Sequence, residues 1–290
     1  DVDLGGDAYM NLMNAVNTGR ISKTALDASV ARVLRLKFEM GLFENPYVDP
    51  EKAKKEVRSE ESVTLARRVA QASITLLKNE HSLLPLNKNR KVALIGPNAE
   101  NGYNMLGDYT APQEEENIKT VLDGIRAKLS SSQVEYVKGC SIRDTVTTDI
   151  EQAVAAAQRS EVIIAVVGGS SARDFKTSYK ETGAAIADEK TISDMECGEG
   201  FDRATLSLLG KQQELLKALK ATGKPLKVVY IEGRPLDKNW ASENADAVLP
   251  AYYPGQEGGI AIADVLFGDF NPAGRLPFSV PRSVGPIPLY

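Results

Sequence analysis

The feature that most restricts the fold is a series of short apolar runs after residue 78, separated by segments with helical periodicity. The runs are rich in β-branched residues and span residues 91–96, 135–140, 162–169, 226–233 and 247–252. Strands that are apolar along their whole length are buried on both faces, and alternation with helices is typical of parallel sheets. The pattern therefore predicts an α/β domain over residues 78–290, with a mostly parallel sheet sandwiched by helices.

The segments between these runs are expected to form the covering helices. Apolar residues recur at helical spacing over residues 117–129, 148–159 and 205–222. In the second segment Thr148 and Glu151 have the spacing of a capping box, which predicts the start of that helix.

The first 77 residues have a different, helical character. Ser22 is placed to cap a helix that ends at Gly41, and Asp49 followed by Pro50 predicts the start of another helix that runs to about Ala72. Residues 1–6 resemble the end of a strand. We therefore expect a short N-terminal part, residues 1–45, and a helical linker, residues 46–77, before the α/β domain.

Composition excludes several classes of protein. A net charge of −4 and scattered basic residues offer no surface for nucleic acid. No run of 18 apolar residues predicts a membrane span. Cys140 and Cys197 with the single histidine, His81, cannot form a structural zinc site, and two separate thiols are favoured over a disulfide.

The strongest candidate for a functional segment is the long loop from Ser170 to about Arg203. It lies beyond the carboxyl end of a predicted strand, where open α/β sheets bind ligands. Its acidic residues form three groups: Asp188 and Glu189, Asp194 and Glu196, Glu199 and Asp202. Glu199 lies between two glycines, which allow close approach to a ligand. From spacing alone, a solvated or helix-capping role for Glu199 is favoured over a catalytic one.

Other motifs are absent or weak. The sequence has no GxxxxGK[ST] loop, and the glycines around Glu199 lack the third glycine of a dinucleotide fingerprint. Ser170 and Ser171 have no histidine partner for a catalytic triad. Trp240, Tyr252 and Tyr253 could stack on sugars, although a core position is favoured at least for the tryptophan.

Several segments in the correct order resemble glycoside hydrolase family 3, over essentially the whole chain. They are LLKNE with LLPL (76–86), KVALIGPNA with LGDY (91–109), YPGQEGG (253–259) and ADVLFGDFNPAGRLPFSVP (263–281). The resemblance implies that residues 78–290 are the family's α/β sandwich domain. Residues 1–6 and 19–49 resemble the last strand and closing helices of its (β/α)8 barrel, which would be truncated here.

The resemblance also assigns site residues. ECGEGFDR (196–203) resembles the family's GEG(F/Y)DR loop, which implies that Glu199 is the general acid/base, with Glu196 as the fallback. Asp202 and Arg203 match positions expected to hold the loop. The family's nucleophile lies in the barrel and its motif is not matched here, not even by Asp3. No metal and no cofactor are implied.

The expected activity is hydrolysis of terminal non-reducing β-linked sugars by a retaining mechanism with two carboxylates. SYKETGAA before DMECGEGFDRATL resembles bacterial β-xylosidases, which favours xylo-oligosaccharides or aryl glycosides as substrates. β-Glucosidase is the alternative, because the discriminating residues lie mostly in the barrel. The expected partner is the missing barrel domain, and the resemblance implies a periplasmic or secreted protein.

Two readings compete with this enzyme. A non-catalytic carbohydrate-binding fragment would share the fold and lack a nucleophile. A flavodoxin-like nucleotide binder would need a phosphate loop after the first strand, where KVALIGPNAENG instead places Glu100, which repels phosphate.

Overall fold

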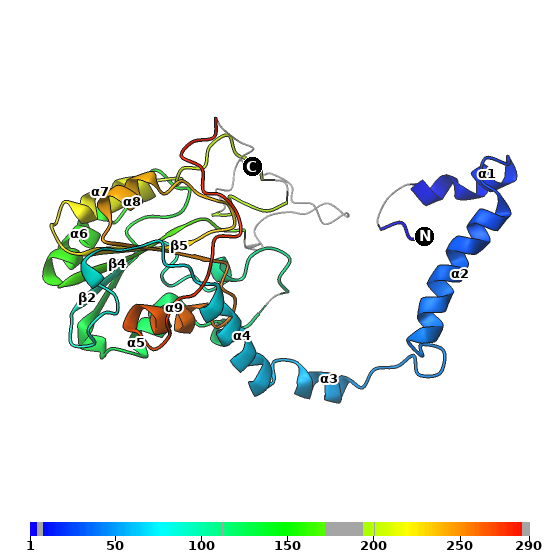
Figure 1. Cartoon of the computed structure of the whole chain (residues 1–290), viewed down its shortest axis with the longest axis horizontal. Helices are drawn as coiled ribbons and strands as arrows, with labels where there is room; N and C mark the ends of the chain where they lie inside the picture. The colour runs from blue at the N-terminus through cyan, green and yellow to red at the C-terminus, as the bar shows by residue number, and fades with distance from the viewer. Residues whose placement is uncertain (5–7, 112, 172–193, 200, 286–290) are drawn as a thin grey trace. The chain divides into compact units, whose positions relative to one another are not determined.

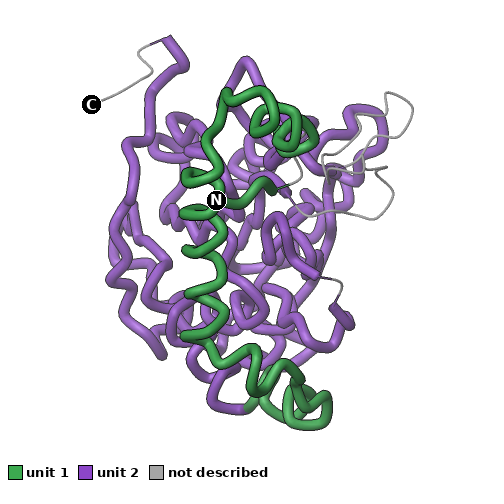
Figure 2. Tube along the Cα trace, turned by 90° about the vertical axis from the view of Figure 1, so that its right-hand side faces the viewer, with its two compact units in different colours: residues 1–59 green, residues 60–290 purple. Residues whose placement is uncertain are grey.

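The computed structural model describes residues 1–4, 8–111, 113–171, 194–199 and 201–285. The chain divides into two compact units, residues 1–59 and residues 60–290, which are coloured separately in Figure 2. Each unit is described by itself below.

The first unit is helical. It contains the 3-10 helix η1 (Ala8–Asn11) and the helices α1 (Leu12–Asn17), α2 (Lys23–Glu39) and α3 (Pro50–Glu56). The Ser22 hydroxyl accepts a hydrogen bond from the Ala25 amide, and the Asp49 carboxylate caps α3 ahead of Pro50. Both predicted helix starts are therefore confirmed. Residues 1–4 form no strand, since a strand requires a paired neighbour for its backbone groups.

The prediction of one helix from Pro50 to Ala72 is wrong. The structure has two helices, α3 and α4 (Glu60–Ser73), which belong to different units. Val57 ends α3 in an extended conformation, and Arg58 has φ +59°, in the left-handed region. A non-glycine residue with this φ interrupts a right-handed helix.

The second unit is built on one sheet of six strands. The strands are β1 (Lys78–Asn79), β2 (Val92–Ile95), β3 (Val134–Val137), β4 (Val162–Gly168), β5 (Leu226–Ile231) and β6 (Ala247–Tyr252). Their order is β1-β6-β5-β4-β2-β3, and every neighbouring pair is parallel except β1 with β6. The predicted mostly parallel sheet is confirmed.

Helices cover both faces of this sheet (Figure 1). On one face lie α6 (Ile150–Arg159), α7 (Gln212–Lys220) and α8 (Asn239–Asn244), and on the other α4, α5 (Val121–Arg126) and α9 (Gly258–Phe267). Short 3-10 turns complete the connections: η2 (Glu80–Ser82), η3 (Tyr103–Met105), η4 (Glu115–Asn117) and η5 (Ser131–Gln133).

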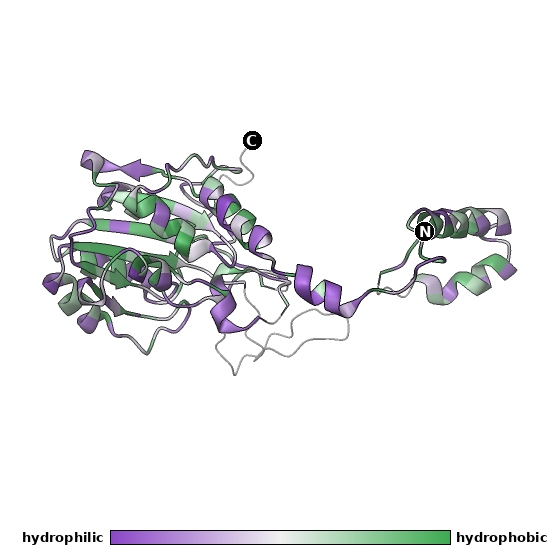
Figure 3. Ribbon diagram, turned by 90° about the horizontal axis from the view of Figure 1, so that it is seen from below, coloured by the Kyte–Doolittle hydropathy of each residue, from purple (hydrophilic) through white to green (hydrophobic). Residues whose placement is uncertain are grey.

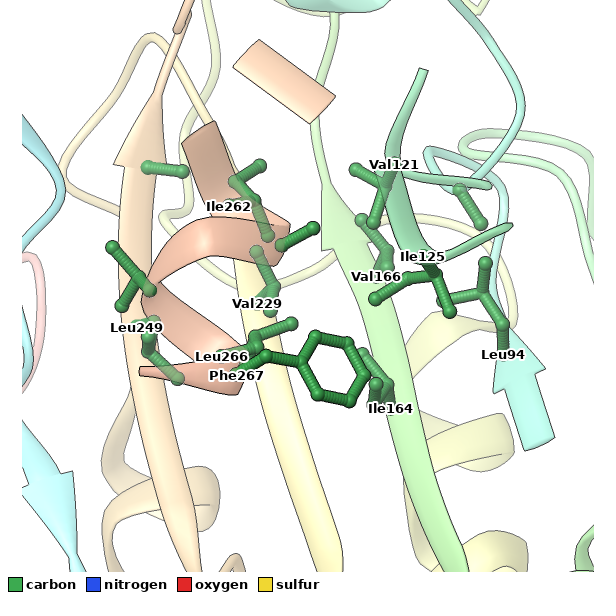
Figure 4. Packing of buried hydrophobic residues seen from close by; sticks show 14 of the residues in the cluster. Leu94, Val121, Ile125, Ile164, Val166, Val229, Leu249, Ile262, Leu266 and Phe267 are labelled. Atoms are coloured by element: carbon green, nitrogen blue, oxygen red, sulfur yellow. The ribbon is translucent and has the colours of Figure 1, made fainter. Parts of the chain in front are cut away.

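The core consists of two apolar layers, one on each face of the sheet. The central strands are mostly hydrophobic, whereas the covering helices show both polar and apolar residues (Figure 3). In one layer Leu94, Ile164 and Val166 of the sheet pack against Val121 and Ile125 of α5 (Figure 4). Burial on both faces explains why these strands lack polar alternation.

Two local predictions are wrong. The helix expected from residue 205 begins only at Gln212, because Gly210 has φ +59°, which a right-handed helix does not permit, and a Cβ there would lie 2.7 Å from the Ile142 carbonyl. The capping box of Thr148 and Glu151 is not formed. Asp149 is the N-cap residue, and Thr148 instead pairs with Cys140 in an isolated β-bridge.

A buried carboxylate joins the helices of the α9 face. Asp264 on α9 accepts hydrogen bonds from Arg67 (2.6 Å) and Gln71 (2.7 Å) on α4. Lys128, which follows α5, donates to its other oxygen at 2.6 Å. Since the Asp264 side chain is almost fully buried, these partners compensate a charge that would otherwise be costly.

Among the helices that the structure describes, none has both the length and the apolar composition that crossing a bilayer requires.

Candidate active site

The topology of the sheet identifies one edge as the place for a site. From β2 the chain passes outward to β3 and then returns across β2 to β4, so the connections diverge between β2 and β4. Ligands in open α/β sheets bind beyond the carboxyl ends of the strands at such a switch point. The loops that follow β2 and β4 meet there.

A buried polar network fixes these two loops to each other. Asn98 donates to the Gly169 carbonyl (3.1 Å), Asn104 donates to the Asn98 side-chain oxygen (2.7 Å), and Ser170 donates to the Asn104 side-chain oxygen (2.7 Å). All three side chains are buried, so each bond also satisfies a group that has lost water. The network therefore joins the start of one loop to the start of the other.

Glu199 lies exposed at this edge, held by two residues of the loop after β2. Tyr109 Oη donates to Glu199 Oε2 at 2.7 Å, and the Glu199 amide donates to Asp108 Oδ2 at 3.3 Å. The neighbouring Gly198 has φ +109°, and a Cβ there would lie 2.8 Å from Asp108 Oδ2. The glycine before Glu199 is thus required for this close approach.

Tyr109 adopts an unusual backbone conformation at the tip of its loop. Its φ is +59°, which is rare for an aromatic residue, and its side chain is exposed. Gly107, two residues earlier, has φ +83° and packs against the ring of Tyr253. Strained residues of this kind cluster at functional sites.

Glu196, unlike the exposed Glu199, is buried. Its side chain is 1% exposed and pairs with Arg203 Nη1 at 2.6 Å and with Arg234 Nε at 3.8 Å. A Cβ on Gly169 would lie 1.8 Å from Glu196 Oε1, so only glycine leaves room for this carboxylate. Glu196 is therefore enclosed between two cations and a glycine.

The two arginines also hold the loop backbone. Arg203 donates to the Ser207 carbonyl, and Arg234, from the segment after β5, donates to the Phe201 carbonyl. The Glu196 amide in turn donates to the Ser170 carbonyl at 2.8 Å. The ion cluster of Glu196, Arg203 and Arg234 thus anchors both sides of Glu199 to the sheet.

A second buried ion pair lies at the end of β5. Lys238 Nζ is 2.7 Å from Glu232, and burial raises the pKa of Glu232 and lowers that of Lys238. The negative charge of Glu196 also raises the pKa of Glu232. Cys197 is a free thiol whose pKa is raised, first by burial and then by the charge of Glu196, as is expected of an inert cysteine.

The remaining predicted residues are distributed differently. Asp202 is exposed and forms no hydrogen bond or ion pair within the described part of the chain. Asp3, in the first unit, accepts a hydrogen bond from the Tyr9 amide. Most of the long insertion, including SYKETGAA at 178–185, lies outside the described residues. Cys140 is a free, buried cysteine.

Sequence reasoning gave no role to Asp108, Tyr109 and Arg234. The first two lie in the LGDY segment, which in the sequence carries only a family resemblance. Their position after β2, at the same sheet edge as Glu199, was the available signal. Trp240 packs against the core, as favoured above, whereas Tyr253 lies against Gly107 beside the site.

Comparison with known proteins identifies the family. Residues 74–290 match the family described as the glycosyl hydrolase family 3 C-terminal domain. The chain belongs to glycoside hydrolase family 3. Among curated relatives, the periplasmic β-glucosidase of Salmonella typhimurium is 34% identical, over 100% of this chain and 38% of its own length. A β-xylosidase of Formosa agariphila is 36% identical, over 91% of this chain and 34% of its own length.

Solved structures of family 3 enzymes share the fold. The β-glucosidase of Listeria innocua, in complex with gluconolactone, superposes with a TM-score of 0.83 at 32% identity, over 99% of this chain and 36% of that one. A β-glucosidase of Erythrobacter marinus gives a TM-score of 0.80 at 35% identity, over 97% and 38%. The chain thus spans little more than a third of the length of each of these four relatives.

Proposed function

We propose that the chain supplies the general acid/base, Glu199, of a retaining β-glycosidase that removes terminal non-reducing sugars. The observation that carries the proposal is the contrast between the two glutamates of one loop. Glu199 is exposed at the switch point of the sheet, whereas Glu196 is enclosed by Arg203 and Gly169. Of the two, only Glu199 is accessible to a glycosidic oxygen.

The chemistry requires two carboxyl groups that act in turn. In the first step the acid protonates the leaving oxygen while a nucleophilic carboxylate attacks the anomeric carbon and forms a glycosyl-enzyme. In the second step the same acid, now ionised, takes a proton from the water that releases the sugar. The hydrogen bond that Tyr109 donates to the Glu199 carboxylate would keep this group oriented, while the bond from the Glu199 amide to Asp108 would hold its backbone.

The nucleophile is proposed to come from a (β/α)8 domain outside this chain, and residues 1–45 are proposed to be the end of that barrel. Arg203 is proposed to hold the acid/base loop, which its contacts with Glu196 and Ser207 support. Asp202 is assigned to the same role by resemblance alone.

Xylo-oligosaccharides are the proposed substrates, by the resemblance of the loop sequence to bacterial β-xylosidases. The second candidate is β-glucosidase activity, which the names of the Listeria innocua and Salmonella typhimurium relatives favour. The periplasmic location named for the Salmonella protein supports a proposed periplasmic or secreted location here.

The test compares hydrolysis of p-nitrophenyl β-xyloside and β-glucoside by two proteins, the chain alone and the chain joined to its upstream barrel. The proposal expects turnover only by the joined protein, with the faster substrate defining the sugar. Full activity of the chain alone would contradict it, and sugar binding without turnover by the joined protein would support a non-catalytic fragment.

A further inference from the structure

A cavity of about 540 Å³ opens beyond the carboxyl ends of β2 and β3. Its volume falls in the range of small-molecule sites. Neither Tyr109 nor Glu199 is among its lining residues. The walls come from the loop after β2, the turn η4, the start of α5 and the end of β3. The cavity is therefore distinct from the candidate active site, although one loop contributes to both.

Two tyrosines in the lining are held in place before any ligand arrives. Tyr103 Oη donates to the Gln113 carbonyl at 2.7 Å and accepts from the Gln113 amide at 2.8 Å. Tyr136 is half-buried beside Glu100, and burial followed by the charge of Glu100 raises the pKa of Tyr136 to about 12. Fixed aromatic rings give apolar contact area at little entropic cost.

The charged and polar residues of the lining do not fit an anionic ligand or a metal ion. Glu100, Glu115 and Asp123 face a single ammonium group, Lys138, so an anionic ligand such as phosphate is repelled. Within the described residues, no group of three or more His, Cys, Asp or Glu side chains is arranged to hold a metal ion. These carboxylates can instead accept hydrogen bonds from hydroxyl groups, although one oxygen of Asp123 already accepts from Thr120.

The ligand that fits is neutral, rich in hydroxyl groups, and has an apolar ring face. Carboxylate oxygens accept hydrogen bonds from hydroxyls, while the Asn101 amide and the Lys138 ammonium donate to them. Apolar sugar faces pack on aromatic rings such as those of Tyr103 and Tyr136. We propose that this cavity is a second, non-catalytic binding site for neutral oligosaccharides.

The site would act by keeping oligosaccharides near the catalytic loop. Tyr103 and Tyr109 are six residues apart on one loop, which places their Cα atoms within about 20 Å of each other. A chain held in the cavity raises the effective concentration of its free end at that distance. The proposal concerns binding alone, so it does not depend on the acid/base role of Glu199.

The test is an NMR titration of the isotope-labelled 290-residue chain with xylotetraose and with cellotetraose, in the millimolar range. The expected result is saturable binding of at least one of them, with shift changes centred on Asn101, Tyr103 and Tyr136. Tyr136→Ala should weaken binding at least about tenfold through loss of the ring. Glu115→Gln should weaken it several-fold, whereas Glu114→Gln, its exposed neighbour outside the cavity, should bind as the unchanged chain does.

Three results would overturn the proposal: no saturable binding of either tetrasaccharide, shift changes centred on Glu199, or equal binding by Glu115→Gln and Glu114→Gln. Thermal unfolding of each variant shows whether it is folded. If Tyr136→Ala does not fold, comparing Glu115→Gln with Glu114→Gln still tests the proposal. Both side chains are exposed and neither lies in the core, so both variants should fold.

Discussion

The phenol of Tyr109 donates a hydrogen bond to Glu199 Oε2 at 2.7 Å, and this bond joins the loop after β2 to the loop after β4. The adjacent Asp108 accepts from the Glu199 amide. Glu199 is thus held at its backbone and at its side chain by consecutive residues. This arrangement orients the carboxyl group while leaving it exposed to a substrate.

Tyr109→Phe, made in the protein joined to its barrel, should reduce kcat/KM for glycosides whose leaving group needs protonation. A hydrogen bond to a charged group contributes about 1.5–3 kcal/mol, so the expected loss is roughly tenfold to a hundredfold. Dinitrophenyl glycosides, which leave without protonation, should lose little. The measurement is kcat/KM against leaving-group basicity, at constant aglycone size.

Tyr252→Phe is the matched control, because the Tyr252 hydroxyl lies 3.4 Å from Thr75 Oγ1 and forms no hydrogen bond with Glu199. It should leave the dependence on the leaving group unchanged. If Tyr109→Phe lowers kcat/KM equally for good and poor leaving groups, Tyr109 does not act through Glu199.

The ion cluster around Glu196 should matter mainly for folding. Arg203→Met leaves the Glu196 carboxylate buried without its nearest cation, which should lower the free energy of unfolding by about 3–5 kcal/mol. Arg159→Met is the control, since the pair of Arg159 with Glu135 is solvent-exposed and should contribute little. Urea unfolding measures both, and equal small losses would contradict the anchoring role of the cluster.

The α/β fold could be predicted because its strands carry an unambiguous pattern. Runs such as residues 162–169 are apolar at every position, which only a sheet covered on both faces permits. The helix expected from residue 205 begins later because Gly210 has a positive φ, which helical periodicity does not reveal. A Cβ at Gly210 would also lie 2.7 Å from the Ile142 carbonyl, so a segment far away in the sequence restricts this position.

Lys227 should destabilise the protein at neutral pH. It is fully buried in β5, and its Nζ has no hydrogen-bond partner among the described residues. Burial is the main reason that its pKa is lowered to about 8. Lys227→Met should therefore raise the free energy of unfolding at pH 7, by at most about 3 kcal/mol at 1.36 kcal/mol per pKa unit.

The stability gained by Lys227→Met should decrease as pH rises. Between about pH 8 and pH 10.5 the unfolded chain binds more protons at Lys227 than the folded chain does, so the unchanged protein becomes more stable as pH rises. The advantage of Lys227→Met should shrink over that range. Lys217→Met, on the exposed side of α7, is the control and should show no such trend. A pH-independent gain would contradict the assignment.

Asp264 should stabilise the protein only while it is ionised. Burial alone would raise the pKa of Asp264, but hydrogen bonds from Lys128, Arg67 and Gln71 hold it below its ordinary value. Asp264→Asn should cost about 3–5 kcal/mol at neutral pH. The difference should be complete above the unfolded pKa of about 4 and vanish as pH falls through the lower folded value.

Unfolding experiments from acid to neutral pH measure this difference. Asp269→Asn, which removes a more exposed partner of Lys128, should have a much smaller effect. A loss for Asp264→Asn that persists unchanged in acid would indicate a packing defect and not a lost charge.

The candidate site was only partly predictable. The resemblance selected Glu199 over Glu196 through the motif GEGFDR, but the sequence holds no sign that one glutamate is exposed and the other enclosed. That difference arises from Gly169, Arg203 and Arg234, which reach the loop from separate segments. Tyr109 was missed for the same reason, because 90 residues separate it from its partner.

The most direct test of the central claim compares Glu199→Gln with Glu196→Gln in the protein joined to its barrel. The account predicts that Glu199→Gln lowers kcat/KM for p-nitrophenyl substrates by about 10²–10⁴-fold without unfolding the protein, and that azide restores turnover by yielding a β-glycosyl azide. Glu196→Gln should reduce stability, with no response to azide. An unaffected Glu199→Gln enzyme, or azide rescue of Glu196→Gln instead, would contradict the account.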